Sequence, residues 1–122
     1  MSDIDRKAVE DEKLEAGLRL RCHQMAGRIY NSLSIFRHVL DELGKETDPV
    51  IKQKVQDCSE ELESLKKVTH TAQHDMVAVD QLQKKGRLQE VLERLDEIYK
   101  DVSDATNGLL RIRLKAHSQF EN

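Results

Sequence analysis

The run Arg21–Gly44, RCHQMAGRIYNSLSIFRHVLDELG, decides the fold of this chain. Its apolar residues recur at helical spacing, and the row with a strict seven-residue repeat is Cys22, Ile29, Phe36 and Leu43. A second row lies beside it: Leu18, Met25, Ser32 and Val39. The flanking positions Ala26, Leu33 and Leu40 are also apolar, so the stripe is wider than a two-stranded coiled coil requires. The pattern predicts an amphipathic helix over residues 6–43 that packs against at least two other helices.

The next segment continues the same pattern after a short break. Asp48 is a suitable N-cap and Pro49 a suitable first helical residue, which predicts a second helix over 49–83. Its two apolar rows are Val55, Leu62, Thr69 and Met76, and Ile51, Cys58, Leu65, Ala72 and Val79.

A third helix is predicted over residues 87–118. The preceding Lys84-Lys85-Gly86 is typical of a helix end, but one glycine costs a helix only about 1 kcal/mol relative to alanine. The second and third helices are therefore either separated at Gly86 or continuous through it. Within the third segment, Asn107-Gly108 indicates a kink or an early helix end.

Together these segments predict one all-α domain over residues 1–122. Short connections between long helices favour antiparallel neighbours, so we expect an elongated antiparallel three-helix bundle with coiled-coil-like packing. The apolar residues are too periodic for a disordered chain, although 35% of the residues are charged.

Composition excludes several classes of function. The net charge of −3 gives no electrostatic argument for binding nucleic acid, and no apolar run is long enough to span a bilayer. The start of the sequence is acidic and lacks the apolar region of a signal peptide. The two cysteines are then expected to be reduced thiols of an intracellular protein, either nuclear or cytoplasmic.

The strongest candidate for a metal site is the pair His70 and His74, four residues apart on one helix. Folding the first two helices about their connection places Cys22 and His23 level with His70 and His74 along the bundle axis. Cys22 nevertheless occupies an inward position of its heptad, whereas the three histidines occupy outward ones. The sequence therefore predicts no metal and no cofactor, and it predicts solvated histidines.

No residue pattern indicates catalysis or a small-molecule substrate. Gly-rich phosphate loops, Gly-x-Ser-x-Gly and Cys-x-x-Cys are all absent from the sequence. Cys22 and Cys58 lie among aliphatic residues, without a base to activate a thiolate. We expect the protein not to be an enzyme.

Residues that break the apolar pattern are the candidates for binding a partner. The apolar residues at outward positions are Leu20, Tyr30, Val77, Leu110 and Leu114. The polar residues at inward positions are Ser32, Thr69, Thr106 and Arg113. Two basic stretches add the charged candidates Arg28, Arg37, Arg111 and Arg113. Either another protein's helix covers these positions, in a homo- or hetero-oligomer, or the chain packs imperfectly as a monomer.

Two stretches carry a resemblance to a known family. The run Arg21–Leu40, with Gln24, Met25 and the pair Ile35-Phe36, resembles the first conserved helix of the Mediator complex subunit thirty family. Val91–Leu110 resembles the last helix of that family, which also ends in Asn and Leu. The family has a longer insertion between its second and third helices than this chain has. The resemblance implies a non-catalytic nuclear subunit that bridges regulators and RNA polymerase II.

Two hypotheses for the function follow. The first is a non-catalytic protein–protein interaction subunit or scaffold of a larger complex, such as a transcriptional coactivator. The second is a free-standing adaptor or tethering bundle of membrane traffic, the cytoskeleton or signalling, which binds a partner helix in a groove.

Overall fold

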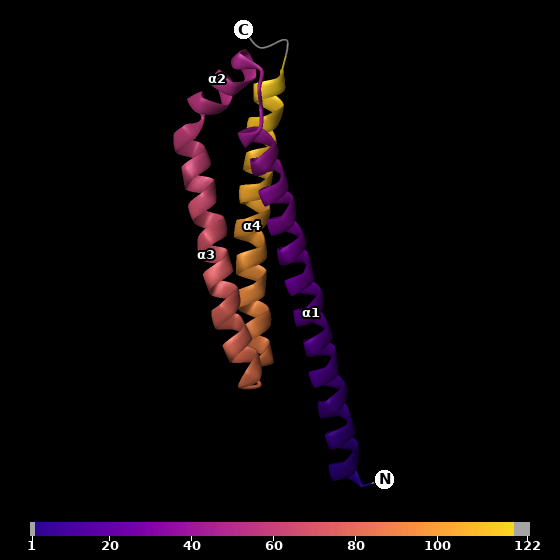
Figure 1. The fold of residues 1–122 in the computed structure, drawn as a ribbon. Coiled ribbons are helices and arrows are strands. Elements are labelled where there is room, and N and C mark those ends of the chain that lie inside the picture. The colour runs from indigo at the N-terminus through magenta and orange to yellow at the C-terminus, as the bar shows by residue number, and fades with distance from the viewer. Residues whose placement is uncertain (1, 119–122) are drawn as a thin grey trace.

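The computed structural model describes residues 2–118, and all regular structure in that part of the chain is helical. The long helices run up, down and up, so α1 and α4 are parallel to each other and antiparallel to α3 (Figure 1). The all-α class and the helical bundle are confirmed. The predicted number of helices is wrong, because the second segment forms two of them. The elements are α1 (Asp3–Gly44), α2 (Pro49–Asp57), α3 (Ser59–Lys84) and α4 (Leu88–His117).

The break that the sequence did not predict lies at Cys58. This residue leaves helical geometry, with φ −99° and ψ 15°, and its N–H donates to the Val55 carbonyl at 3.1 Å. Asp57, Cys58 and Ser59 all have low helix propensity, so the chain bends there at small cost. α2 consequently crosses the end of the bundle (Figure 1), and Lys54 Nζ donates to the Ser118 carbonyl at 3.1 Å.

The position of α2 changes the register between α1 and α3. The prediction that Cys22 lies level with His70 and His74 is wrong. Cys22 instead lies beside the start of α4, where its Sγ is 3.7 Å from the Leu88 carbonyl oxygen. Val77 of α3 is one of the residues that line a surface hollow together with Tyr30 of α1.

α4 is the central helix of the bundle. Close backbone approach is concentrated between α4 and α1 and between α4 and α3, and it is sparse between α1 and α3. α4 accordingly buries eleven residues, against six in α1 and five in α3. α4 therefore has a different partner helix on each side, and α1 and α3 share the core cluster that contains Ile29 and Met76.

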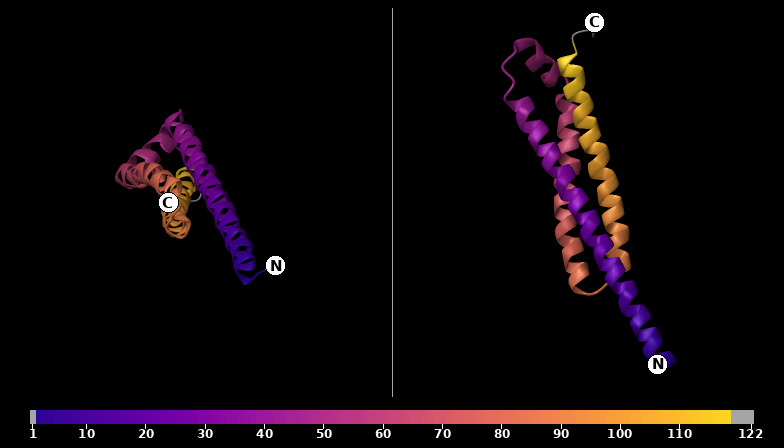
Figure 2. Two further views of the ribbon diagram at one scale, coloured as in Figure 1. Left: turned by 90° about the horizontal axis from the view of Figure 1, so that it is seen from below. Right: turned by 90° about the vertical axis from the view of Figure 1, so that its right-hand side faces the viewer.

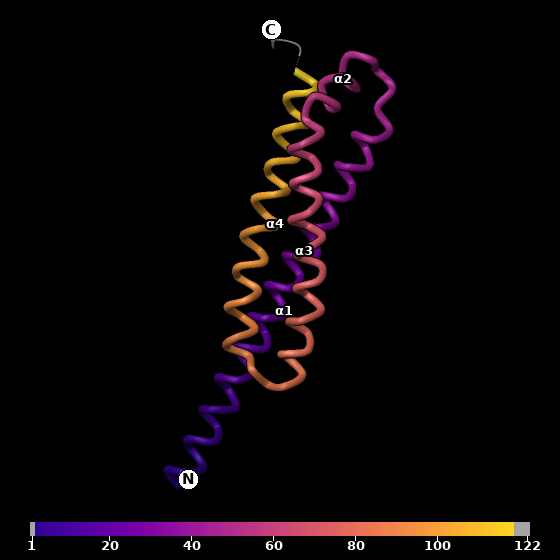
Figure 3. The backbone as a smooth tube through the Cα atoms, turned by 90° about the vertical axis from the view of Figure 1, so that its left-hand side faces the viewer, coloured from indigo at the N-terminus to yellow at the C-terminus, as the bar shows by residue number. Residues whose placement is uncertain are grey.

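The N-terminal part of α1 projects beyond the bundle. Cys22 is the first buried residue of α1, and of residues 2–21 all are exposed except the half-buried Leu18. With 42 residues the helix is about 63 Å long. Figures 2 and 3 show it passing the α3–α4 turn into solvent.

The helix ends with the clearest local chemistry are confirmed. Asp48 Oδ1 accepts hydrogen bonds from the backbone N–H of Val50 at 2.9 Å and of Ile51 at 3.4 Å. Gly86 has φ +76° and ends α3, because its N–H donates to the Gln83 carbonyl and the N–H of Arg87 donates to the Leu82 carbonyl. α3 and α4 are thus separate helices.

The predicted kink or early end at Asn107-Gly108 is wrong. α4 continues through both residues to His117. Gly108 is buried, and a Cβ built there would lie 3.2 Å from Leu65 Cδ2. The glycine therefore serves close packing of α4 against α3.

Candidate partner-binding site

A groove of about 550 Å³ runs along the solvent side of the α3–α4 interface. We call it the α3–α4 groove. Its floor is apolar and is formed by Leu65, Val68, Ala72, Ile98 and Ala105. Its rim is polar and is formed by Ser64, Lys67, Thr71, Asp75, Asp101 and Asp104.

The groove exists because small side chains lie next to the place where α3 and α4 contact each other most closely. α3 and α4 meet tightly where Leu65 packs at Gly108. Along the floor, Ala72 and Ala105 are both buried, and their side chains end at Cβ. α1 packs on the other side of α4 and lines none of this surface. An apolar trough therefore stays open to solvent.

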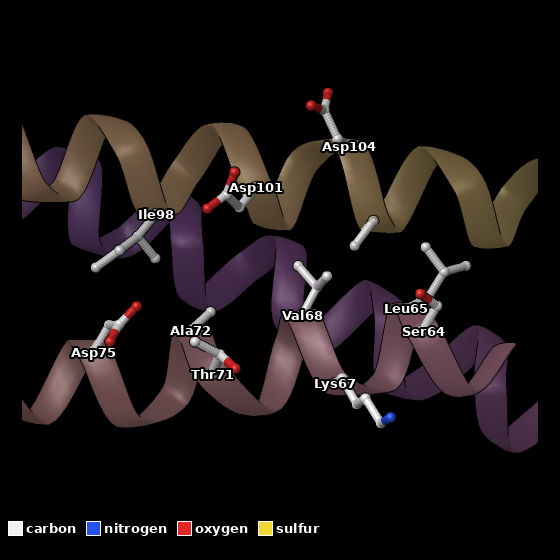
Figure 4. A pocket seen from close by; sticks show the side chains of 11 residues that line it. Ser64, Leu65, Lys67, Val68, Thr71, Ala72, Asp75, Ile98, Asp101 and Asp104 are labelled. Carbon is white, nitrogen blue, oxygen red and sulfur yellow. The ribbon is translucent and has the colours of Figure 1, made fainter. Parts of the chain in front are cut away.

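The charges at the groove are unevenly placed. In Figure 4, Asp75 of α3 and Asp101 of α4 extend toward one another at the same end of the groove. Asp104 points away from α3, and Lys67 points away from α4 (Figure 4). Within residues 2–118, neither Asp75 nor Asp101 forms an ion pair with a cationic side chain. The open end of the trough therefore carries two facing carboxylates without a counter-charge.

Three of the predicted partner-binding residues are brought together elsewhere. Tyr30 and Arg37 of α1 and Val77 of α3 line a second surface hollow of about 350 Å³, which we call the α1–α3 hollow. Its floor includes the buried side chains of Leu33 and Met76.

The remaining apolar candidates are scattered. Leu20 is exposed on α1, and Leu114 is exposed near the end of α4. Leu110 is half-buried and packs against the core cluster around Phe36 and Leu109, so its prediction as an outward residue is wrong.

The arginine candidates do not form one patch. Arg28 lines a shallow surface depression with Leu92 and Asp96 of α4. Arg113 Nη1 lies 3.3 Å from Glu42 Oε2, which ties α4 to α1. Arg111 Nε donates to the carbonyl of Asn107, one turn earlier, at 3.4 Å. Arg111 and Arg113 therefore have partners within the chain.

The polar residues of the core are also satisfied within the chain. The hydroxyls of Ser32 and Thr106 lie 3.0 Å apart, and Thr106 also donates to the Val102 carbonyl at 2.8 Å. The Thr69 hydroxyl donates to the Lys66 carbonyl at 2.9 Å. In the described residues, no buried side-chain polar atom lacks a partner. The hydroxyls of Ser32, Thr69 and Thr106 therefore need no partner protein to satisfy their hydrogen bonds.

The candidate metal ligands are dispersed. His70 and His74 are exposed, with their Nε2 atoms 3.2 Å apart. His23 is exposed on α1, and Cys22 is buried in the core. Across residues 2–118, no group of three or more His, Cys, Asp or Glu side chains converges as a metal site would require. The structure thus does not bring the four residues together.

The two cysteines lie in separate core clusters as free thiols. Burial raises the pKa of the Cys22 thiol above its ordinary value of 9.0. A raised pKa keeps the thiol protonated and weakens it as a nucleophile. Of the described residues that line the α3–α4 groove, none is a histidine or a cysteine.

The α3–α4 groove was missed at the sequence level. Val68, Ala72, Ile98 and Ala105 have the spacing of core residues. Asp101 belongs to a strongly charged helix surface. One pattern could have indicated the site: alanines face each other on two neighbouring helices, with carboxylates beside them.

The chain matches no known family model, no curated protein and no solved structure. Between residues 2 and 118, no helix combines the length and the apolarity needed to cross a membrane.

Proposed function

We propose that this protein is a non-catalytic helical interaction module that binds an amphipathic helix of a partner protein in the α3–α4 groove. The observation that carries the proposal is an open, apolar-floored groove in a bundle whose own helices already fill its core. A groove with an apolar floor between two helices is a common way for a bundle to bind a partner helix.

The dimensions of the groove suit a helix. Its lining on α3 extends from Ser64 to Asp75, which is about 16 Å or three helical turns. A helix docked in a groove places apolar anchors at positions i, i+3 or i+4, and i+7. Three turns accommodate such a set over Val68 and Ala72.

Both hypotheses from the sequence use such a site. A core that is filled by the chain's own helices favours a module that folds by itself and then recruits a partner. The alternative is an obligate subunit of a larger complex, for which the projecting part of α1 and the α1–α3 hollow offer additional surface. Membership of the Mediator subunit thirty family stays a prediction from the resemblance.

Affinity purification from cells tests the proposal with a matched pair of variants. Thr71→Trp fills the groove from its exposed rim, and Asn31→Trp adds the same ring to an exposed position of α1 outside the groove. Circular dichroism checks that both variants stay folded.

The wild type and Asn31→Trp are expected to recover the same partners, and Thr71→Trp is expected to lose them. Equal recovery by all three proteins would show that the groove is not the binding site. Recovery of Mediator subunits by the wild type would support the coactivator hypothesis, and their absence would remove it.

A further inference from the structure

We infer that the helix bound in the α3–α4 groove is basic, and that one of its lysine or arginine side chains inserts between Asp75 and Asp101. This inference rests on the proposed function, because it specifies the occupant of the same groove. It assigns the two aspartates as the residues that select the partner.

The two carboxylates face each other from different helices. Asp75 is half-buried, whereas Asp101 is exposed (Figure 4). Two carboxylates at one end of the groove repel each other and a negatively charged occupant, and both attract a cation. A cation inserted between them would turn that repulsion into two charge-assisted hydrogen bonds. The free protein is therefore arranged for a cation that it does not itself supply.

The cation is organic rather than a metal ion. In the part of the chain that the structure describes, no third carboxylate, histidine or cysteine joins Asp75 and Asp101 to complete a ligand set. A lysine or arginine needs only the two carboxylates, and its aliphatic stem can lie along Val68 and Ile98.

Neighbouring charges strengthen the preference for a basic partner. Glu97 and Asp104 are exposed and lie four residues before and three residues after Asp101, so they share one face of α4 with Asp101 and with the cation Lys100. Lys67 lies on the outer rim of α3 and points away from the groove (Figure 4). The α4 side of the groove is thus the acidic side, and the basic face of the occupant is expected to lie there.

A second copy of this chain does not fit that requirement. Its net charge is −3, and its projecting segment carries the exposed acidic run Glu10-Asp11-Glu12 followed by Glu15. The same segment carries Arg6, Lys7, Lys13, Arg19 and Arg21, so it is close to neutral and would bring no net positive charge to an acidic groove. Charge complementarity therefore selects a different protein, with an apolar stripe flanked by lysine or arginine.

The test uses three designed 18-residue amphipathic peptides with the same leucine stripe and with lysine, glutamine or glutamate on the polar face. Each is titrated into the full chain, with calorimetry for affinity and amide NMR shifts for location. The protein variants are Asp75→Asn with Asp101→Asn, and the control Asp96→Asn. Asp96 lies on the same helix, outside the groove and facing α1.

The lysine peptide is expected to bind most tightly and to shift amide signals from 64–75 and 98–105. The double Asn variant is expected to lose about threefold to tenfold in affinity for that peptide, and Asp96→Asn less than about twofold. Raising the salt concentration is expected to remove most of the difference between the lysine and glutamine peptides.

The outcomes separate the inference from the proposed function. Equal binding of the lysine and glutamine peptides in the groove, unchanged by the double Asn variant, would overturn the inference and leave the proposed function supported. Failure of every peptide to shift the groove signals would overturn both. A dimer in light scattering whose interface covers the groove would overturn the basic partner in favour of a second copy.

Discussion

Replacing leucine with alanine at two positions of α4 measures how the bundle is stabilised. Leu109 is 0% exposed within the core cluster, and Leu114, five residues later, is 74% exposed. Both changes remove the same atoms from the same helix, and Leu114 lies in its last turn, where helix propensity counts less. The difference in stability between the variants therefore reports chiefly burial.

The size of the difference follows from the environment of each side chain. Full burial of a leucine contributes about 1.5–3 kcal/mol, and its truncation in a packed core leaves a cavity that raises the loss to about 2–5 kcal/mol. Leu114→Ala is expected to change the free energy of unfolding by less than about 0.5 kcal/mol. For a chain of this length, about 3 kcal/mol lowers Tm by about 12 °C.

Urea unfolding followed by circular dichroism gives both values, and repeating it at two protein concentrations detects association. Equal losses at the two positions would refute the burial argument. A large loss at Leu114 that depends on protein concentration would show that another copy covers this residue.

Four further predictions concern local features. Gly108→Leu is expected to lower the free energy of unfolding by about 1–3 kcal/mol, because the larger side chain forces α3 and α4 apart. Gly27→Ala, where the structure leaves open space, is expected to raise it by about 0.5–1 kcal/mol. Urea unfolding measures both changes. Asp48→Ala removes the side-chain cap of α2 and is expected to cost about 1 kcal/mol in the same assay. A thiol reagent at pH 8 is expected to modify Cys58 first and Cys22 only after unfolding. Burial raises the pKa of the Cys22 thiol above 9.0 in the folded protein. The protonated thiol therefore contributes its full stability below pH 9.0, and this contribution is lost as the pH rises through the folded-state pKa. A pH series of melts that compares wild type with Cys22→Ser detects the loss.

The features that local chemistry controls could be predicted from the sequence. Asp48 caps a helix with its own side chain, and Gly86 adopts a positive φ that few other residues tolerate. The apolar rows depend on helical periodicity, so residues such as Ile29 and Leu33 were placed in the core without knowledge of the neighbours.

The features that depend on how helices meet could not be predicted. Val55, Cys58 and Leu62 keep the apolar spacing through the break at Cys58, so the heptad pattern continues although the helix does not. Once α2 crosses the end of the bundle, the register between α1 and α3 shifts. Tyr30 and Val77 line the same surface hollow as a consequence of that shift.

None of the predicted partner-binding residues lines the α3–α4 groove. Exposed apolar residues such as Tyr30, Val77 and Leu114 are visible as breaks in periodicity, and the structure leaves them exposed. The α3–α4 groove is not visible in this way, because Ala72 and Ala105 fit the core pattern. The outer edges of Ala72 and Ala105 stay open to solvent because α1 packs on the other side of α4, and only the three-dimensional packing shows this.

Site-specific photo-crosslinking in cells tests the central claim most directly. A photoreactive residue replaces Thr71 at the rim of the groove, and in a second protein it replaces the exposed Leu114, which lies outside it. The proposed function and the inference together predict a strong crosslink from Thr71 to one partner, mapped to a helix with an apolar stripe and flanking lysine or arginine, and none from Leu114. Crosslinks that arise from Leu114 and not from Thr71 would contradict the groove as the binding site.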